Sequence, residues 1–292
     1  MAVQIDATPV TDATLTGSTR REIASLCQRV RMPLRCIVAI VCVASAFGDA
    51  AAASEPGGVF DYQVRFGPLQ IMSMRVTVQF EEDRYQASSD GRTVGLIGVL
   101  FPWTAASSSS GVRAGGQMRP LRFRSAGEYR GQRRSAELDY DASGAVHAET
   151  DPPPEADDRD PVPAALQQST VDPLTAGINA LLSGCQGTLG VFDGRRRYDL
   201  SLSDLGDSDT PSSRHALYSG RARHCRAAIQ PRAGFWRSQP GDERPSQIDC
   251  WIASPRPGMP PIPVYLELTA PRGTMSVYLA AIDPDAVAPP AP

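Results

Sequence analysis

The chain of 292 residues contains no lysine, because all 29 of its basic residues are arginine. Three classes of enzyme depend on a lysine side chain. A P-loop places lysine on the nucleotide phosphates, a pyridoxal-phosphate enzyme forms a Schiff base with it, and the S-x-x-K hydrolases set it beside the serine. The sequence excludes all three.

Histidine and metal-binding motifs are also scarce. The only histidines are His147, His215 and His224, and no C-x-x-C, H-x-x-x-H or G-x-S-x-G motif occurs. We therefore expect no metal, no cofactor and no nucleophile elbow. Triad members need not be neighbours in sequence, so a hydrolase of envelope polymers that uses scattered carboxylates or histidine remains an alternative.

The overall composition is that of a globular protein, with 41% hydrophobic and 21% charged residues and a formal net charge of −3. No concentrated basic surface is evident, so we expect no nucleic-acid partner. We predict one β-rich domain over residues 57–282 and a loose tail over 283–292.

The amino-terminal region has the pattern of a secretory signal peptide over residues 32–53. A short basic stretch with Arg35 precedes the apolar run Cys36–Phe47, and alanines before Ser54 fit a cleavage site. The apolar run is shorter than the roughly 20 residues of a membrane-spanning helix, so a membrane anchor is the less favoured alternative. Residues 1–31 are either a long basic region or a mis-annotated extension upstream of a start at Met32. We expect a periplasmic or secreted protein without a transmembrane segment after leader removal.

Three cysteines remain beyond that leader: Cys185, Cys225 and Cys250. An odd number allows at most one internal disulfide and leaves one free thiol. We favour Cys185–Cys225, because both residues lie beside strand-like segments joined by a polar loop. Cys225–Cys250 remains the rival pairing.

Alternation with a period of two dominates the rest of the chain. Phe60, Tyr62 and Val64 alternate with polar residues, and so do the apolar residues of 72–80, 121–124, 136–140, 264–268 and 275–279. This pattern predicts a mainly β fold, with one curved antiparallel sheet or an open β-barrel.

Four segments depart from the alternation. Residues 172–183 predict a packed helix that begins at Asp172 and Pro173 and carries an apolar stripe with Leu174 and Ile178. The acidic, proline-rich residues 151–163 predict an exposed loop, and polar residues 203–214 predict another. Glu81-Glu82-Asp83 predicts a solvated hairpin turn.

Several motifs resemble the exported bacterial family known as domain of unknown function 3108 (DUF3108). They are the Asp172-Pro173 helix start, Cys185, the run FDGRRRYDL over 192–200, and the later Cys225. The resemblance implies an exported, β-rich protein. It brings no catalytic residues with it.

The densest polar cluster is the hairpin around Asp193-Gly194, which is typical of a two-residue type I′ turn. Alternation then predicts Arg195, Arg197 and Asp199 on one face. These guanidinium groups, joined by Arg122 and Arg124, form a candidate anion site. A network of Asp–Arg pairs that only stabilises the fold is the favoured alternative.

Met72 and Met74 are candidates for lining an apolar ligand cavity, although such a stripe is more often core. Together these features favour a non-enzymatic periplasmic protein. It would bind an apolar or lipid-like ligand or an envelope-assembly partner. The third hypothesis is a structural or interaction domain whose arginine-rich hairpin contacts an acidic partner.

Overall fold

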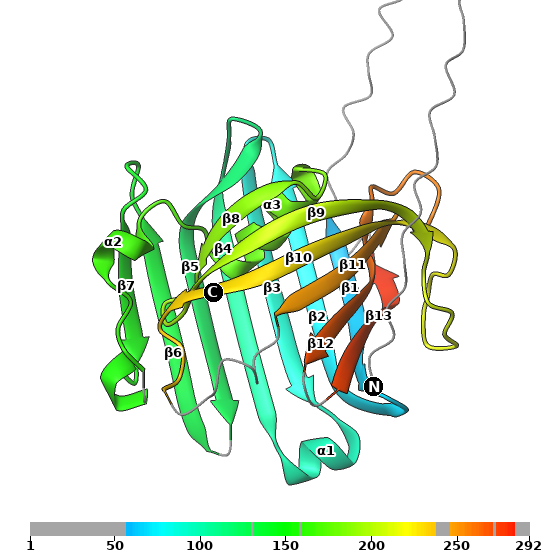
Figure 1. Ribbon diagram of the computed structural model, residues 1–292, viewed down its shortest axis with the longest axis horizontal. Helices are drawn as coiled ribbons and strands as arrows, with labels where there is room; N and C mark the ends of the chain where they lie inside the picture. Colours follow the sequence, from blue (N-terminus) through cyan, green and yellow to red (C-terminus); the bar gives the residue numbers. More distant parts are fainter. Residues whose placement is uncertain (1–56, 130, 158, 238–245, 271–272, 284–292) are drawn as a thin grey trace, which may run out of the picture. The chain divides into compact units, whose positions relative to one another are not determined.

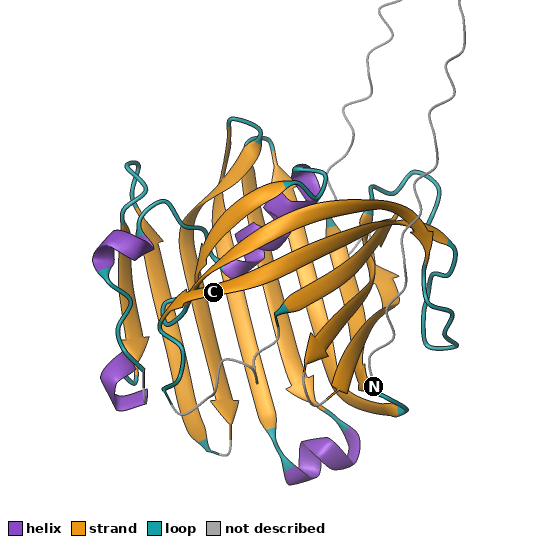
Figure 2. Cartoon of the chain, in the orientation of Figure 1, coloured by secondary structure: helices purple, strands orange, loops and turns teal. Residues whose placement is uncertain are grey.

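The computed structural model describes residues 57–129, 131–157, 159–237, 246–270 and 273–283. The predicted leader, residues 1–53, lies outside them, as does the predicted tail after Asp283. Strands make up most of the described chain (Figure 2). Within these residues no helix is both long enough and apolar enough to cross a bilayer.

One antiparallel sheet contains all thirteen strands, in the order β7-β6-β5-β4-β3-β2-β1-β13-β12-β11-β10-β9-β8 (Figure 1). The two end strands, β7 and β8, do not pair, so the sheet is not closed. This confirms the prediction of a mainly β fold built on one antiparallel sheet. The strands are β1 (Gly58–Phe66), β2 (Leu69–Glu81), β3 (Arg84–Thr93), β4 (Trp103–Ala114), β5 (Gln117–Tyr129), β6 (Gln132–Tyr140), β7 (Val146–Asp151), β8 (Gly187–Phe192), β9 (Arg197–Asp209), β10 (Arg221–Ala233), β11 (Gln247–Ala253), β12 (Ile262–Ala270) and β13 (Gly273–Asp283).

The described residues contain few helices, and these are short. They are α1 (Gly95–Leu100), α2 (Ala164–Gln167), α3 (Pro173–Leu182) and the 3-10 helix η1 (Pro154–Asp157). The predicted helix at 172–183 is α3, and the Asp172 side chain accepts hydrogen bonds from the Leu174 and Thr175 backbone N–H groups.

The α3 helix packs against β3, β4, β5 and β8. We call the sheet face that α3 contacts the inner face and the opposite face the outer face. The residues that α3 buries differ from the predicted apolar stripe. Ile178 is buried, but Leu174 is only half-buried, and the polar Thr175 and Asn179 are fully enclosed.

Polar groups on the sheet explain this choice of helix face. The Asn179 side chain accepts from Met118 N at 2.7 Å and donates to Met118 O at 2.9 Å. Met118 lies in the part of β5 that does not pair with β6, so Asn179 supplies the hydrogen-bond partners that a neighbouring strand would otherwise provide. Ser109 donates to Asp172 at 2.8 Å. Buried polar groups require partners, so this part of the interface is polar. Desolvation on burial raises the pKa of Asp172 above its ordinary value despite these hydrogen bonds.

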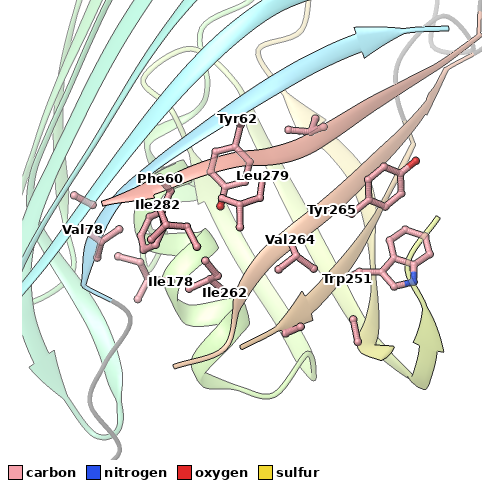
Figure 3. Packing of buried hydrophobic residues seen from close by; sticks show 14 of the residues in the cluster. Phe60, Tyr62, Val78, Ile178, Trp251, Ile262, Val264, Tyr265, Leu279 and Ile282 are labelled. Carbon is pink, nitrogen blue, oxygen red and sulfur yellow. The ribbon is translucent and has the colours of Figure 1, made fainter. Parts of the chain in front are cut away.

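The main apolar core lies on the inner face of β1, β12 and β13, where Phe60, Tyr62, Val264 and Leu279 converge with Ile178 of α3 (Figure 3). A second cluster joins β5 and β6 to the turn that follows β8. It contains Phe123, Leu138, Tyr140, Val162 and Phe192. The alternation of β1 determines this arrangement directly, since Phe60, Tyr62 and Val64 are all buried.

Two predicted loops differ from the structure. Residues 203–209 continue β9, because they pair with β10 up to Asp209–Arg221. The segment 151–163 is not exposed throughout. Arg159 and Val162 are buried, and Arg159 donates to Gly234 O at 2.9 Å while its guanidinium lies 4.2 Å from the Trp236 ring centre.

The predicted two-residue turn at Asp193-Gly194 is a four-residue turn instead. Phe192 pairs with Arg197, and the Asp193 carboxylate accepts from the backbone N–H groups of Arg195 and Arg196. Gly194 has a φ of 90°, which glycine adopts without strain. Arg195 therefore lies in the turn rather than on the strand face of Arg197 and Asp199.

Candidate functional site

Two rows of apolar side chains cross the inner face of the strands that follow α3 in sequence, and one of these rows continues onto β1 and β2. Register partners define the proximal row, which is nearer to α3: Cys225, Cys250, Leu266, Val277, Val64 and Met72. The distal row lies two residues farther along each strand and contains Leu202, Ala227, Ile248, Leu268 and Met275. Together the two rows form what we call the apolar face.

The two rows differ in burial. Val64, Val277 and Cys225 of the proximal row are buried, whereas every residue of the distal row is only half-buried. The reason is positional. The α3 helix contacts β3, β4, β5 and β8 most extensively, and its Ile178 meets β12 and β13 at Val264 and Leu279, farther along these strands than the distal row. Five strands about 4.8 Å apart place the ends of the distal row about 19 Å from each other. The uncovered strip is therefore long and narrow.

The backbone beneath this strip offers no hydrogen-bonding groups to a ligand. Each of β9, β10, β11, β12 and β13 has a paired neighbour on both sides. Backbone N–H and C=O groups in such strands are directed along the sheet towards their neighbours. The apolar face thus presents side-chain carbon and sulfur almost exclusively.

Met72 and Met74, the predicted cavity-lining residues, both lie on the inner face. Met72 extends the proximal row through its partner Val64, and Met74 pairs with Tyr62. Both methionines are half-buried and pack against the main core. Met72 is therefore part of the apolar face, and Met74 adjoins it.

Cys250 places its thiol on this face, opposite Cys225. Cys225 forms the disulfide with Cys185 that the sequence favours, with a Cα–Cα separation of 5.7 Å, and Cys250 is free. Burial, with a smaller contribution from Asp249, raises the pKa of the Cys250 thiol to about 12. The thiol is therefore neutral at physiological pH and behaves as an apolar group.

Arg195 contacts backbone carbonyls rather than a free site. Its guanidinium donates to Ser135 O at 3.0 Å, Asp151 O at 2.8 Å and Pro152 O at 2.9 Å, and only 8% of the residue is exposed. These carbonyls belong to the end of β7 and the adjoining part of β6. Arg195 thereby joins the turn after β8 to the opposite end of the open sheet.

The other three candidate arginines make separate contacts. Arg197 pairs with Asp199 at 2.6 Å and donates to Leu166 O, while Arg122 and Arg124 pair across β5 and β6 with Asp139 and Glu137, each at 2.7 Å. Arg122 and Arg124 flank the buried Phe123 and so lie on the outer face. The structure does not bring these arginines together with Arg195.

The outer face carries two histidine–carboxylate pairs. One is exposed on β7, where His147 Nε2 lies 3.4 Å from Glu149 Oε1, and the other, on β10 and β11, is largely buried. His224 Nε2 lies 2.8 Å from Asp249 Oδ1, and the imidazole stacks on Trp251 with ring centres 4.1 Å apart. Asp249 also accepts from Arg226 and Gln247. The described residues that contact His224 and Asp249 in this cluster are Trp251, Arg226 and Gln247, and none of these side chains is a nucleophile for acyl transfer.

A hollow of about 1220 Å³ crosses the outer face from β1 to β7. Its charged lining includes Asp61 and Arg75, which pair at 2.7 Å, and Asp90, Arg92 and Glu128. Small residues such as Ala106 and Ala126 form its floor. This hollow therefore combines charged side chains with a floor of small apolar residues, and it lies on the face opposite to the apolar rows.

Comparison with known proteins assigns the chain to a family. The model of the family described as "Protein of unknown function (DUF3108)" matches residues 61–280. The chain belongs to the DUF3108 family. The match spans β1 to β13 and confirms the resemblance seen in the sequence, but the description of this family names no activity.

Two solved structures resemble this DUF3108 chain. A β-barrel-like protein of domain of unknown function DUF1849 from Brucella abortus is 10% identical, with a TM-score of 0.46, and the match covers 79% of this chain and 98% of that one. The hypothetical protein CT021 from Chlamydia trachomatis is 10% identical, with a TM-score of 0.29 and coverages of 82% and 93%. No curated protein matches the chain.

Sequence reasoning missed half of the apolar face in this DUF3108 chain. It identified the alternation of β12 and β13 but not the contributions of Leu202, Ala227 and Ile248. The alternation of Leu200 and Leu202 with serine was a usable signal for β9. In β10, the apolar positions are mostly alanines that stand between charged residues, so the alternation of apolar and polar side chains is hard to recognise.

Proposed function

We propose that this protein is a non-enzymatic periplasmic binding protein that holds an extended acyl chain on its apolar face. The observation that carries this proposal is the distal row, where Leu202, Ile248, Leu268 and Met275 stay partly exposed although they lie on the inner face of the sheet. Contiguous apolar side chains that remain accessible to solvent are typical of ligand-binding or interaction sites.

The chemistry of the face favours an acyl chain over a peptide. A peptide that lay on this face would bury its own backbone N–H and C=O groups against side chains that cannot pair with them. Each such unsatisfied group costs about 1–3 kcal/mol. A hydrocarbon chain has no such groups, and its narrow, extended shape matches a strip about 19 Å long.

The available energy is sufficient for binding. Full burial of one large aliphatic side chain stabilises by about 1.5–3 kcal/mol. Covering the remaining exposed part of four, about a third of each at most, therefore contributes about 3 kcal/mol. That gross gain corresponds to about a hundredfold in Kd before the costs of ordering the ligand are subtracted. Contacts with Met72 and Met74 would add to it.

Two further features support the periplasm as the compartment. The Cys185–Cys225 disulfide is typical of an oxidising environment, and residues 32–53 have the pattern of a signal peptide. The engagement of Arg195 with three backbone carbonyls makes an arginine-rich contact hairpin a weaker explanation.

The test uses a fluorescent fatty acid, parinaric acid, and the full chain. The variant Ile248→Gln/Leu268→Gln places two polar side chains in the distal row, and we expect it to weaken binding by about tenfold or more. Leu121→Gln/Leu205→Gln, which changes two exposed leucines outside the apolar face, is the matched control and should bind as the unmodified chain does.

Two results would count against the proposal. One is a complete lack of fatty-acid binding by the unmodified chain, combined with no lipid recovered from the purified protein by mass spectrometry. The other is equal affinity of the distal-row variant and the control. Co-purification of a stoichiometric envelope protein that the distal-row variant loses would identify a protein partner instead.

A further inference from the structure

An exposed apolar protrusion joins β3 to β4. It consists of α1 and the residues that flank it, over 94–102, and it contains no charged residue. Leu96, Val99, Leu100 and Phe101 are 73%, 77%, 58% and 41% exposed, and α1 has no buried residue. In Figure 1, α1 projects beyond the ends of the strands. We call this segment the tip.

The neighbouring β1–β2 hairpin extends the exposed apolar surface. Val94 N donates to Ile71 O at 3.1 Å, which holds the start of the tip against β2. Leu69 and Phe66, which pair with each other at that hairpin, are 59% and 42% exposed. Phe66 is also the register partner of Met275. The distal row of the apolar face therefore leads to the end of the sheet that carries the tip.

The tip has a defined backbone conformation. The Thr93 hydroxyl donates to Phe101 O at 3.0 Å and accepts from Trp103 N at 3.0 Å, so it joins the two ends of the segment. A side chain at Gly98 would meet Thr93 O at 2.8 Å, which requires glycine at this close approach. Hence the fold presents these apolar side chains to solvent on a fixed scaffold.

Basic side chains predominate around the tip. Two carboxylates lie near Arg92: Asp90 on the same strand, and Glu128, which is in register with Arg92 across β4 and pairs with Arg133 at 3.4 Å. No aspartate or glutamate occurs in residues 62–80 or 91–127, the two stretches that build this end of β1–β4. Arg65 and Arg92 flank the tip, and Arg92 makes no ion pair or side-chain hydrogen bond with the described residues. An apolar protrusion next to cationic side chains is complementary to a bilayer with anionic headgroups.

From these observations we infer that the tip inserts into the surface of an anionic lipid bilayer. Leu96, Val99 and Leu100 enter the boundary between headgroups and acyl chains, while Arg65 and Arg92 contact lipid phosphates. Because a bilayer is fluid, a convex protrusion without a matching groove is a suitable shape for this contact. The inference concerns a different surface from the apolar face and does not depend on ligand binding there.

The experiment is a flotation assay of the full chain with two kinds of vesicle. One kind is phosphatidylcholine, and the other is phosphatidylcholine mixed with phosphatidylglycerol. The variant Leu96→Ser/Val99→Ser/Leu100→Ser should lower partitioning into the mixed vesicles by about tenfold or more. The control Leu121→Ser/Leu166→Ser/Leu205→Ser removes three exposed leucines elsewhere, which are 49%, 41% and 45% exposed, and it should partition as the unmodified chain does. Since the unmodified chain and both variants share the same amino terminus, any contribution of residues 1–53 is equal in them.

A second variant tests the cationic part of the inference. Arg65→Gln/Arg92→Gln should reduce partitioning into the phosphatidylglycerol vesicles severalfold and abolish their advantage over pure phosphatidylcholine. Thermal unfolding of each variant checks that the fold is retained.

Three outcomes would overturn the inference. They are the absence of vesicle binding by the unmodified chain, equal partitioning of the tip variant and its control, and a dimer in solution that only the tip variant disrupts. The last would show that the tip is a contact between two copies of the chain. Fatty-acid binding, measured separately, distinguishes a failure of this inference from a failure of the proposed function.

Discussion

Arg195 carries a fixed charge and five N–H donors, and the fold directs three of its hydrogen bonds at backbone carbonyls. Those carbonyls, at Ser135, Asp151 and Pro152, lie where β6 and β7 run out of strand partners. A side chain with several donors in a planar group is suited to such a cluster of acceptors. Arg195 therefore stabilises the fold by satisfying these carbonyl groups, a role that its position in the charged run 193–199 does not indicate.

We expect Arg195→Gln to lower the free energy of unfolding by about 3 kcal/mol, because it leaves buried carbonyl groups without donors. Urea unfolding monitored by circular dichroism measures the change. Arg124→Gln is the control, since it removes an exposed ion pair and should change stability by about 0.5 kcal/mol or less. An Arg195→Gln protein as stable as the unmodified chain would contradict the structural role.

At the scale of elements, α3 is attached to the sheet in two ways. Polar contacts from Asp172 and Asn179 bind it to β4 and β5, and the disulfide ties Cys185, three residues after the last residue of α3, to β10. The helix thus connects the two halves of the open sheet. The same helix leaves the distal row on β9–β13 partly exposed, which is why the apolar face exists.

The disulfide closes a loop of 40 residues in sequence. Replacing both of its cysteines by serine should lower the free energy of unfolding by about 4 kcal/mol, as the chain-entropy relation gives for that separation. The matched control is Cys250→Ala, which removes the free thiol and should cost about 1 kcal/mol. The midpoints of urea unfolding under reducing and oxidising conditions provide the measurement. An unchanged midpoint in the double variant would be inconsistent with a disulfide that stabilises the fold.

At the scale of the whole sheet, ion pairs on the outer face tie neighbouring strands together. Asp199 on β9 pairs with Arg197 and with Arg232 of β10, and Asp249 on β11 pairs with Arg226 of β10. Burial alone would raise the pKa of both carboxyl groups. Hydrogen bonds from Arg197 and Arg232, and from Gln247, His224 and Arg226, outweigh it and leave both pKa values below the ordinary range.

Stability should therefore fall with acidification. A folded pKa below the unfolded value gives stabilisation that is present above the unfolded value, near 3.8, and that is lost as the pH falls through the folded value. Asp172, whose pKa is raised by burial, acts in the opposite direction. We expect Asp199→Asn/Asp249→Asn to be less stable than the unmodified chain at about pH 7 and nearly equal to it at about pH 2.

Urea unfolding at those two pH values checks this expectation. Asp139→Asn, an exposed carboxylate on the same outer face, serves as the control and should show little difference at either pH. A constant gap between the double variant and the unmodified chain across this range would mean that ionisation of the two carboxylates does not stabilise the sheet.

Several features were predictable from the sequence because they depend on neighbours along the chain. Phe60, Tyr62 and Val64 alternate, so one face of β1 had to be buried. Asp172 followed by proline indicated the start of α3, and the spacing of three cysteines left only a few pairings. The absence of lysine excluded three classes of enzyme without any structural information.

Only the tertiary structure decided what depends on distant partners. Polar residues 203–209 are a strand because β10 pairs with them, and Asn179 is buried because it satisfies the peptide groups of Met118. Arg195 is enclosed by carbonyls 43 to 60 residues away in sequence. The apolar face and the tip arise in the same way, since exposure depends on which element covers a side chain, and neither periodicity nor composition contains that information.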